Sequence, residues 1–83
     1  DISMLIPKSI TIDTIISSLE KIDHRIVEVL LIDRFAKAEW NDHISVAVRL
    51  VILDDEKTLE KDTIDGLYHH AVTSLQQLGA QIR

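Results

Sequence analysis

Residues 44–53, ISVAVRLVIL, decide the fold, because their apolar side chains recur with a period of two. Successive side chains of a β-strand point to opposite faces of a sheet, so this segment predicts a strand with one apolar face. That face comprises Ile44, Val46, Val48, Leu50 and Ile52, and the opposite face comprises Ser45, Ala47 and Arg49. One side of this strand is therefore expected to pack into a core.

Three further segments predict strands around it. Residues 26–35, IVEVLLIDRF, are rich in the Val, Ile and Leu side chains that strands favour. Their alternation is interrupted at residues 30–32, so we expect a bulge or burial of both faces there. Residues 2–6, ISMLI, form a strand that Pro7 ends, because proline cannot donate to a strand ladder. Residues 80–83 predict a short final strand.

Two segments have the helical period instead. Thr11 is the predicted N-cap of the first, whose apolar stripe comprises Ile12, Ile15, Ile16, Leu19 and Ile22. The second helix is predicted over residues 61–78, with Ile64, Leu67, Ala71, Val72, Leu75 and Leu78 on one face. Gly79 occupies the position of a left-handed C-terminal cap. Gly66 lies inside this helix and should weaken it by about 1 kcal/mol relative to Ala. Residues 54–57 predict a polar turn.

The predicted order β-α-β-β-α-β indicates an α+β fold of the ferredoxin-like, split βαβ type. We expect one domain over residues 1–83, with a four-stranded antiparallel sheet and two helices on one face. Two helices leave the other face open, and function is expected there. On that face Phe35 lies with Asp33, Ser45 and Arg49, an arrangement suited to stacking a nucleobase and contacting its edges. The alternative is that Phe35 belongs to the core, Asp33 to a turn and Arg49 to a solvated surface.

The composition limits the classes of function. The net charge of −5 argues against non-specific nucleic-acid binding, so an RNA-binding chain would need local base contacts. Cysteine is absent, which excludes disulfides, thiolate metal sites and cysteine catalysis and fits a cytoplasmic location. No apolar run reaches the ~20 residues that cross a membrane. His69 and His70 diverge by about 100° on a helix, which argues against a metal site. No motif of catalysis is present.

Five short motifs occur in order along the chain: residues 1–7, DISMLIP; 31–35, LIDRF; 44–50, ISVAVRL; 57–59, KTL; and 79–83, GAQIR. Their order and spacing resemble the ferredoxin-fold anticodon-binding domain that ends bacterial phenylalanyl-tRNA synthetase beta chains. The resemblance covers nearly the whole chain. It implies a module that binds the anticodon of phenylalanine tRNA and has no active site or cofactor of its own.

The resemblance also implies the partners. The parent protein would be the beta subunit of phenylalanine–tRNA ligase, in an α2β2 heterotetramer whose alpha subunit is catalytic and which uses ATP and magnesium. No membrane partner is expected. By the same resemblance the first anticodon base stacks on Phe35, with Asp33 and Ser45 at base edges and Ser3 as a weaker candidate. Candidates for phosphate contacts, chosen on charge alone, are Arg34, Arg49 and Lys37.

The chain departs from the family pattern at several positions. Phe35 replaces a tyrosine, Ile44 a lysine, and Glu60 a frequent threonine helix cap. The connection at residues 36–43, AKAEWNDH, lacks the usual Gly and Pro, and its Trp40 would either extend the stacking surface or plug the loop. The lead-in to the first strand is missing, so we expect this strand to be truncated at its start.

Other functions of the same fold remain alternatives. Amino-acid-sensing regulatory modules need a glycine-bearing turn after the first strand, where this chain has Pro7, Lys8 and Ser9. Acylphosphatases need a glycine-rich anion loop, which we do not find. A protein–protein docking module with Phe35 and Trp40 as anchors is the remaining alternative. Fold class does not separate these functions.

Overall fold

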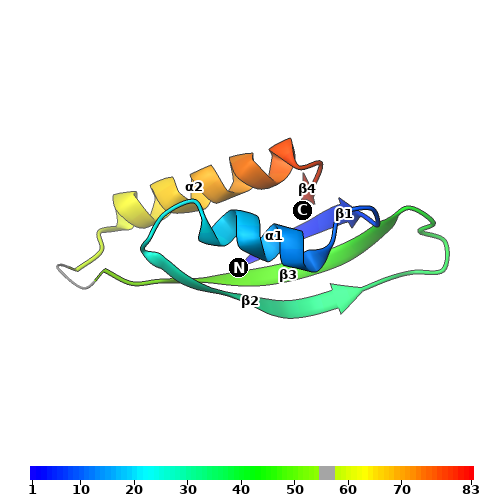
Figure 1. Cartoon of the computed structure of the whole chain (residues 1–83), viewed down its shortest axis with the longest axis horizontal. Coiled ribbons are helices and arrows are strands. Elements are labelled where there is room, and N and C mark those ends of the chain that lie inside the picture. Colours follow the sequence, from blue (N-terminus) through cyan, green and yellow to red (C-terminus); the bar gives the residue numbers. More distant parts are fainter. Residues whose placement is uncertain (55–57) are drawn as a thin grey trace.

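The computed structural model describes residues 1–54 and 58–83. One antiparallel sheet has the strand order β2-β3-β1-β4, and both helices lie on one side of it (Figure 1). The elements are β1 (Ile2–Pro7), α1 (Ile12–Glu20), β2 (Ile26–Phe35), β3 (His43–Ile52), α2 (Lys61–Gln77) and β4 (Gln81–Ile82). The predicted ferredoxin-like α+β fold is therefore confirmed. Residues 55–57 of the predicted polar turn lie outside the described part.

The central strand β3 supplies the middle of the core. Ile44, Val46 and Val48 are buried beneath the helices, and they pair with Ile6, Met4 and Ile2 of β1, which are also buried. Alternate residues of both strands are thereby removed from water, at about 25 cal/mol per Å² of apolar area. The period-two pattern predicted for residues 44–53 is confirmed. The observed strand begins and ends one residue earlier than the predicted one.

Two register shifts interrupt the pairing of β2 with β3, between Ile26 and Glu28 and between Leu31 and Asp33. The second is the irregularity expected near residues 30–32. Leu31 lies opposite the buried Val48, whereas Asp33 lies opposite Ala47 on the other face. A bulge of this kind adds one residue and so reverses which side chains point to each face.

Helix α1 begins as the sequence predicts. The Thr11 hydroxyl accepts a hydrogen bond from the Thr14 N–H at 3.1 Å, which satisfies one of the free donors of the first turn. Ile15 and Leu19 are buried against the sheet. The predicted N-cap is thus confirmed, and it sets where the helix leaves the β1–α1 connection.

Helix α2 buries Leu67, Ala71 and Leu75, while Ile64 in its first turns is 37% exposed. Its N-cap residue, Glu60, makes no capping hydrogen bond through its side chain. The helix ends at Gln77 with Leu78 as its C-cap, and the next residue, Gly79, has a φ of 103° in the left-handed region that side chains with a Cβ disfavour. The predicted cap is confirmed, and it turns the chain into β4.

A short turn joins α1 to β2. The Asp23 carboxylate accepts hydrogen bonds from the backbone N–H of Arg25 at 2.8 Å and from its guanidinium at 2.9 Å. The Arg25 side chain, followed by its backbone N–H, holds the pKa of Asp23 well below its ordinary value of 3.8. The turn delivers the chain to the outer strand of the sheet.

Among the described residues, no helix combines the length and the apolar character needed to cross a membrane.

The two glycines should respond in opposite ways to alanine. Gly66→Ala should raise the free energy of unfolding by about 1 kcal/mol, because a Cβ there meets nothing within 4 Å and alanine favours the helix. Gly79→Ala should lower it by about 1–2 kcal/mol, because of its positive φ. Urea denaturation of both variants provides the measurement, and equal shifts would contradict the cap geometry.

Removal of the Asp23 carboxylate should change the pH dependence of stability. A depressed native pKa stabilises the fold above the unfolded pKa, and this stabilisation is lost as the pH falls below about 4. Asp23→Asn should therefore be less stable than wild type at neutral pH, with a difference that shrinks in acid. Denaturation curves recorded from pH 7 downwards test this, and a difference independent of pH would contradict it.

Candidate nucleic-acid interface

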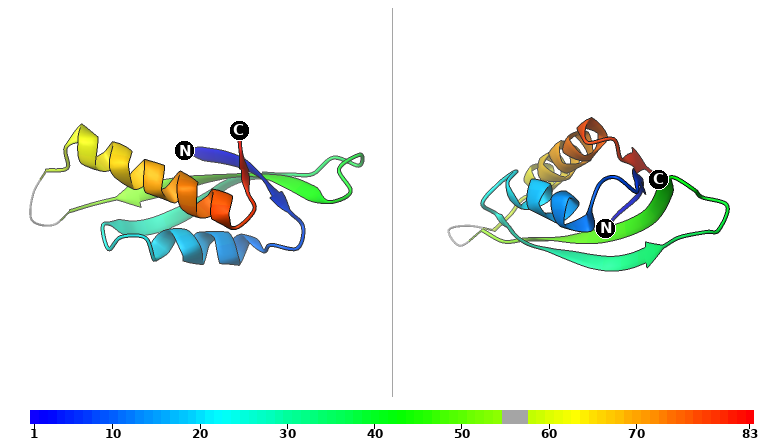
Figure 2. Two further views of the ribbon diagram at one scale, coloured as in Figure 1. Left: turned by 90° about the horizontal axis from the view of Figure 1, so that it is seen from above. Right: turned by 45° about the vertical axis from the view of Figure 1, so that its right-hand side comes forward.

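The face of the sheet opposite the helices carries side chains in rows that run across the strands. One row, defined by strand register, comprises Phe35 of β2, Ser45 of β3, Leu5 of β1 and Gln81 of β4. The right-hand view of Figure 2 shows both helices on one side of the sheet, which leaves the opposite side uncovered by them. This surface, from here on the open face, brings together residues that are far apart in the sequence.

A second row lies beside the first. It comprises Asp33, Ala47 and Ser3, and the backbone N–H of Arg83 donates to the Ser3 carbonyl at 2.9 Å. Asp33 and Phe35 share the open face because both register shifts of β2 come before Asp33. Asp33 thus lies two residues from Phe35 on the same strand, and Ser3 lies two strands away in the second row.

The Phe35 ring is 51% exposed, and Phe35 pairs with Ser45 at the end of β2. The alternative, in which Phe35 belongs to the core, is wrong because the residue is half exposed and lies opposite Ser45, on the face away from the buried Ile44 and Val46. An exposed aromatic ring on a sheet can stack a nucleobase whatever its sequence, because every base has a π-face.

The loop between β2 and β3, residues 36–42, bends so that Trp40 reaches the first row. Its ring meets that of Phe35 edge-on, with centroids 6.0 Å apart and planes at 90°. Trp40, Leu5, His43 and Gln81 line a small cavity of about 100 Å³. The volume of this cavity is well below the roughly 300–1,000 Å³ typical of small-molecule sites. The cavity can therefore admit only the edge of a ring system.

Two cations gather at Trp40. The Lys37 ammonium lies 5.1 Å from the centroid of the indole ring, and the Arg83 guanidinium carbon lies 6.0 Å from it. Both distances fall within the roughly 6 Å range of cation–π attraction. The positive charge near Phe35 thus comes from the loop and from the end of the chain.

Arg49 also lies on the open face, but its charge is offset. Its guanidinium donates two hydrogen bonds to the Asp1 carboxylate, at 2.9 and 3.2 Å. Both side chains are about half exposed, so the pair contributes at most about 1 kcal/mol to stability. A phosphate would have to compete with Asp1 for this arginine.

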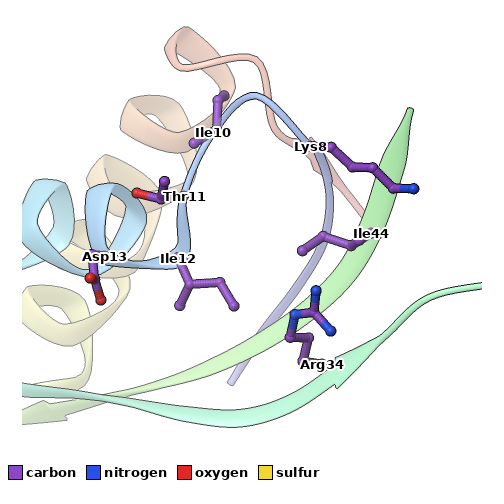
Figure 3. Close-up of a pocket in the computed structure, with 7 residues that line it drawn as sticks. All are labelled: Lys8, Ile10, Thr11, Ile12, Asp13, Arg34 and Ile44. Atoms are coloured by element: carbon purple, nitrogen blue, oxygen red, sulfur yellow. The ribbon is translucent and has the colours of Figure 1, made fainter. Parts of the chain in front are cut away.

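Arg34 lies on the helix side, because it is opposite the buried Val46. Figure 3 shows it beside a cavity of about 270 Å³ that is also lined by Lys8, Ile44 and the start of α1. The structure therefore does not bring Arg34, the candidate phosphate contact chosen on charge alone, together with Phe35, Asp33 and Ser45.

The described residues contain no cluster of three or more His, Asp or Glu side chains placed to hold a metal ion. His69 and His70 are both exposed on α2, away from the open face. The arrangement on the open face is one of an aromatic ring, short polar groups and cations, which suits binding rather than bond making.

Comparison with known families also indicates a binding domain. The family model described as the ferredoxin-fold anticodon-binding domain matches residues 1–83. The chain belongs to this family. No curated protein sequence matches it significantly. Membership assigns to this anticodon-binding domain a role in binding tRNA and no catalytic step of its own.

Several residues of the interface were missed in the sequence. Leu5 and Gln81 alternate with buried or partly buried neighbours on β1 and β4, and Arg83 continues this alternation just after β4, so strand parity together with the strand order could have found them. The positions of Lys37 and Trp40 relative to the sheet had no such signal, because loop residues follow no period.

The contact between the rings of Phe35 and Trp40 can be tested by a double-mutant cycle. Edge-to-face aromatic pairs contribute about 0.5–1.5 kcal/mol beyond their buried area, and the exposure of Phe35 places this pair near the lower limit. Unfolding free energies of Phe35→Leu, Trp40→Leu and the double variant should give a coupling energy of about 0.5 kcal/mol. Additive effects would show that the loop does not pack on the sheet in solution.

Proposed function

We propose that this domain is the anticodon-binding module of a phenylalanyl-tRNA synthetase beta subunit, and that Phe35 stacks on the first anticodon base of phenylalanine tRNA. The observation that carries the proposal is the half-exposed ring at the end of β2, in one row with Ser45 and next to Asp33. Family membership supports anticodon binding. The five motifs found in the sequence support the phenylalanine enzyme among those that carry such a domain.

The polar neighbours of the ring would supply base discrimination. An ionised carboxylate only accepts hydrogen bonds, so Asp33 favours a base edge that presents N–H donors. The hydroxyl of Ser45 both donates and accepts, and it lies on the strand next to Phe35. Ser3 is one strand further from Asp33, beyond Ala47, which fits its lesser role.

Binding energy here would serve recognition and orientation while a separate catalytic alpha subunit attaches phenylalanine. The parent enzyme would be a cytoplasmic α2β2 heterotetramer that uses ATP and magnesium. Because the chain carries a net charge of −5, most phosphate contacts would come from the rest of that enzyme, and the isolated domain should bind RNA weakly.

One observation favours a second function, docking to another protein. The outer strand β2 exposes Val27, Leu30, Leu31 and Ile32, each at least 40% accessible. A long apolar edge strand offers free backbone groups to a partner strand. These four apolar residues precede Asp33 and Phe35 on the same strand, so a docked partner would lie beside the row that contains Phe35 and Ser45.

Replacing the ring should weaken RNA binding specifically. Phe35→Ala should reduce affinity for an anticodon stem-loop of phenylalanine tRNA by about 1–3 kcal/mol, the contribution of one stacked base, and Phe35→Tyr should retain it. Leu53→Ala is a matched control, since Leu53 is also exposed but lies at the opposite end of β3. Titration followed by NMR chemical shifts gives the affinities.

A stem-loop with altered anticodon bases completes the experiment. It should bind less tightly to the wild-type domain, because Asp33 and Ser45 would lose their partners at the base edges, and Phe35→Ala should weaken its binding further, because stacking tolerates any base. Equal affinity of the wild-type and Phe35→Ala domains for the phenylalanine stem-loop would contradict the stacking role.

A further inference from the structure

The two cations beside Trp40 are held differently from Arg49, the other cation described on the open face. Lys37 and Arg83 contact the indole ring, at 5.1 and 6.0 Å from its centroid. Within residues 1–54 and 58–83, no carboxylate forms an ion pair with either cation. Arg49, in contrast, is held by the Asp1 carboxylate.

The two ways of holding a cation have different consequences for an anionic ligand. A carboxylate cancels the charge that it positions, so a phosphate must displace it. An aromatic ring attracts a cation through its quadrupole and carries no net charge. Lys37 and Arg83 are therefore held in place with their charges available, in a chain whose net charge is −5.

The loop holds Trp40 without any glycine or proline. The N–H of Trp40 donates to the Lys37 carbonyl at 3.0 Å, which forms a turn that brings the two side chains together. At the other end of the loop, the N–H of Lys8 donates to the Asp42 carbonyl at 2.8 Å. The edge-on contact with Phe35 then joins the loop to the open face.

We propose that Trp40 is a positioning residue for RNA: its indole holds the Lys37 ammonium and the Arg83 guanidinium beside Phe35, where they meet the phosphates that flank the stacked base. The inference rests on the proposed function, in which single-stranded RNA lies on the open face. Side chains that are already ordered lose less conformational freedom on binding, so these two cations contribute more than free ones would.

The test is the salt dependence of binding to the phenylalanine anticodon stem-loop. Removing one cation that neutralises a phosphate lowers the slope of log K against log salt concentration by about 0.7 for a single strand. Lys37→Ala and Arg83→Ala should each produce this decrease in the wild-type background. In the Trp40→Leu background the same substitutions should change slope and affinity much less, whereas Trp40→Phe should restore the wild-type behaviour.

Lys21→Ala is the matched control, because Lys21 is an exposed lysine at the end of α1 on the other side of the sheet. It should leave the slope unchanged in both backgrounds. Equal effects of Lys37→Ala with and without Trp40 would overturn the inference, since the lysine would then act independently of the ring.

Two readouts separate this inference from the proposed stacking. Dependence of binding on Phe35 without coupling between Trp40 and Lys37 would overturn only the positioning role. Coupling without any effect of Phe35→Ala would overturn only the stacking role, and absence of binding at millimolar RNA would overturn both. Without RNA, the side-chain protons of Lys37 should show upfield ring-current shifts that Trp40→Leu removes, and their absence in wild type would overturn the positioning role.

Discussion

The packing of α1 and α2 against one face of β3 and β1 is the constraint on which the interface depends. Alternate residues of the two strands form a buried layer beneath the helices: Ile2, Met4 and Ile6 of β1 and Ile44, Val46 and Val48 of β3. Because the strand period is two, burial of one set of side chains necessarily turns the other set towards solvent. Two helices cannot cover both faces, so the open face is a consequence of how the core forms.

The bulge in β2 adjusts this arrangement at one position. From Glu28 to Leu31 the strand follows one alternation, and from Asp33 it follows the other. Without the extra residue, Asp33 and Phe35 would point under the helices, and Arg34 would take their place on the open face. A local irregularity therefore decides which of three consecutive residues lie on the open face, and it explains why Arg34, a candidate chosen on charge alone, lies on the helix side.

On the open face, the group that holds each cation matters more than the number of cations. Arg49 is neutralised by Asp1, whereas Lys37 and Arg83 are held against the uncharged indole of Trp40. An acidic chain lacks the broad positive surface that attracts nucleic acid non-specifically. In the proposed function, a few cations placed beside an aromatic ring would let such a chain favour one RNA segment.

The sequence by itself determined the elements, the β-α-β-β-α-β order, the Thr11 and Gly79 caps, and the faces of β1 and β3. These features follow from local periodicity and capping chemistry, which act over a few residues. Only the tertiary structure decided that Arg34 lies on the helix side, that Asp1 holds Arg49, and that Trp40 brings Lys37 and Arg83 together. Those outcomes depend on a register shift and on contacts between the loop, β1 and β4, which are distant along the chain and leave no periodic pattern in it.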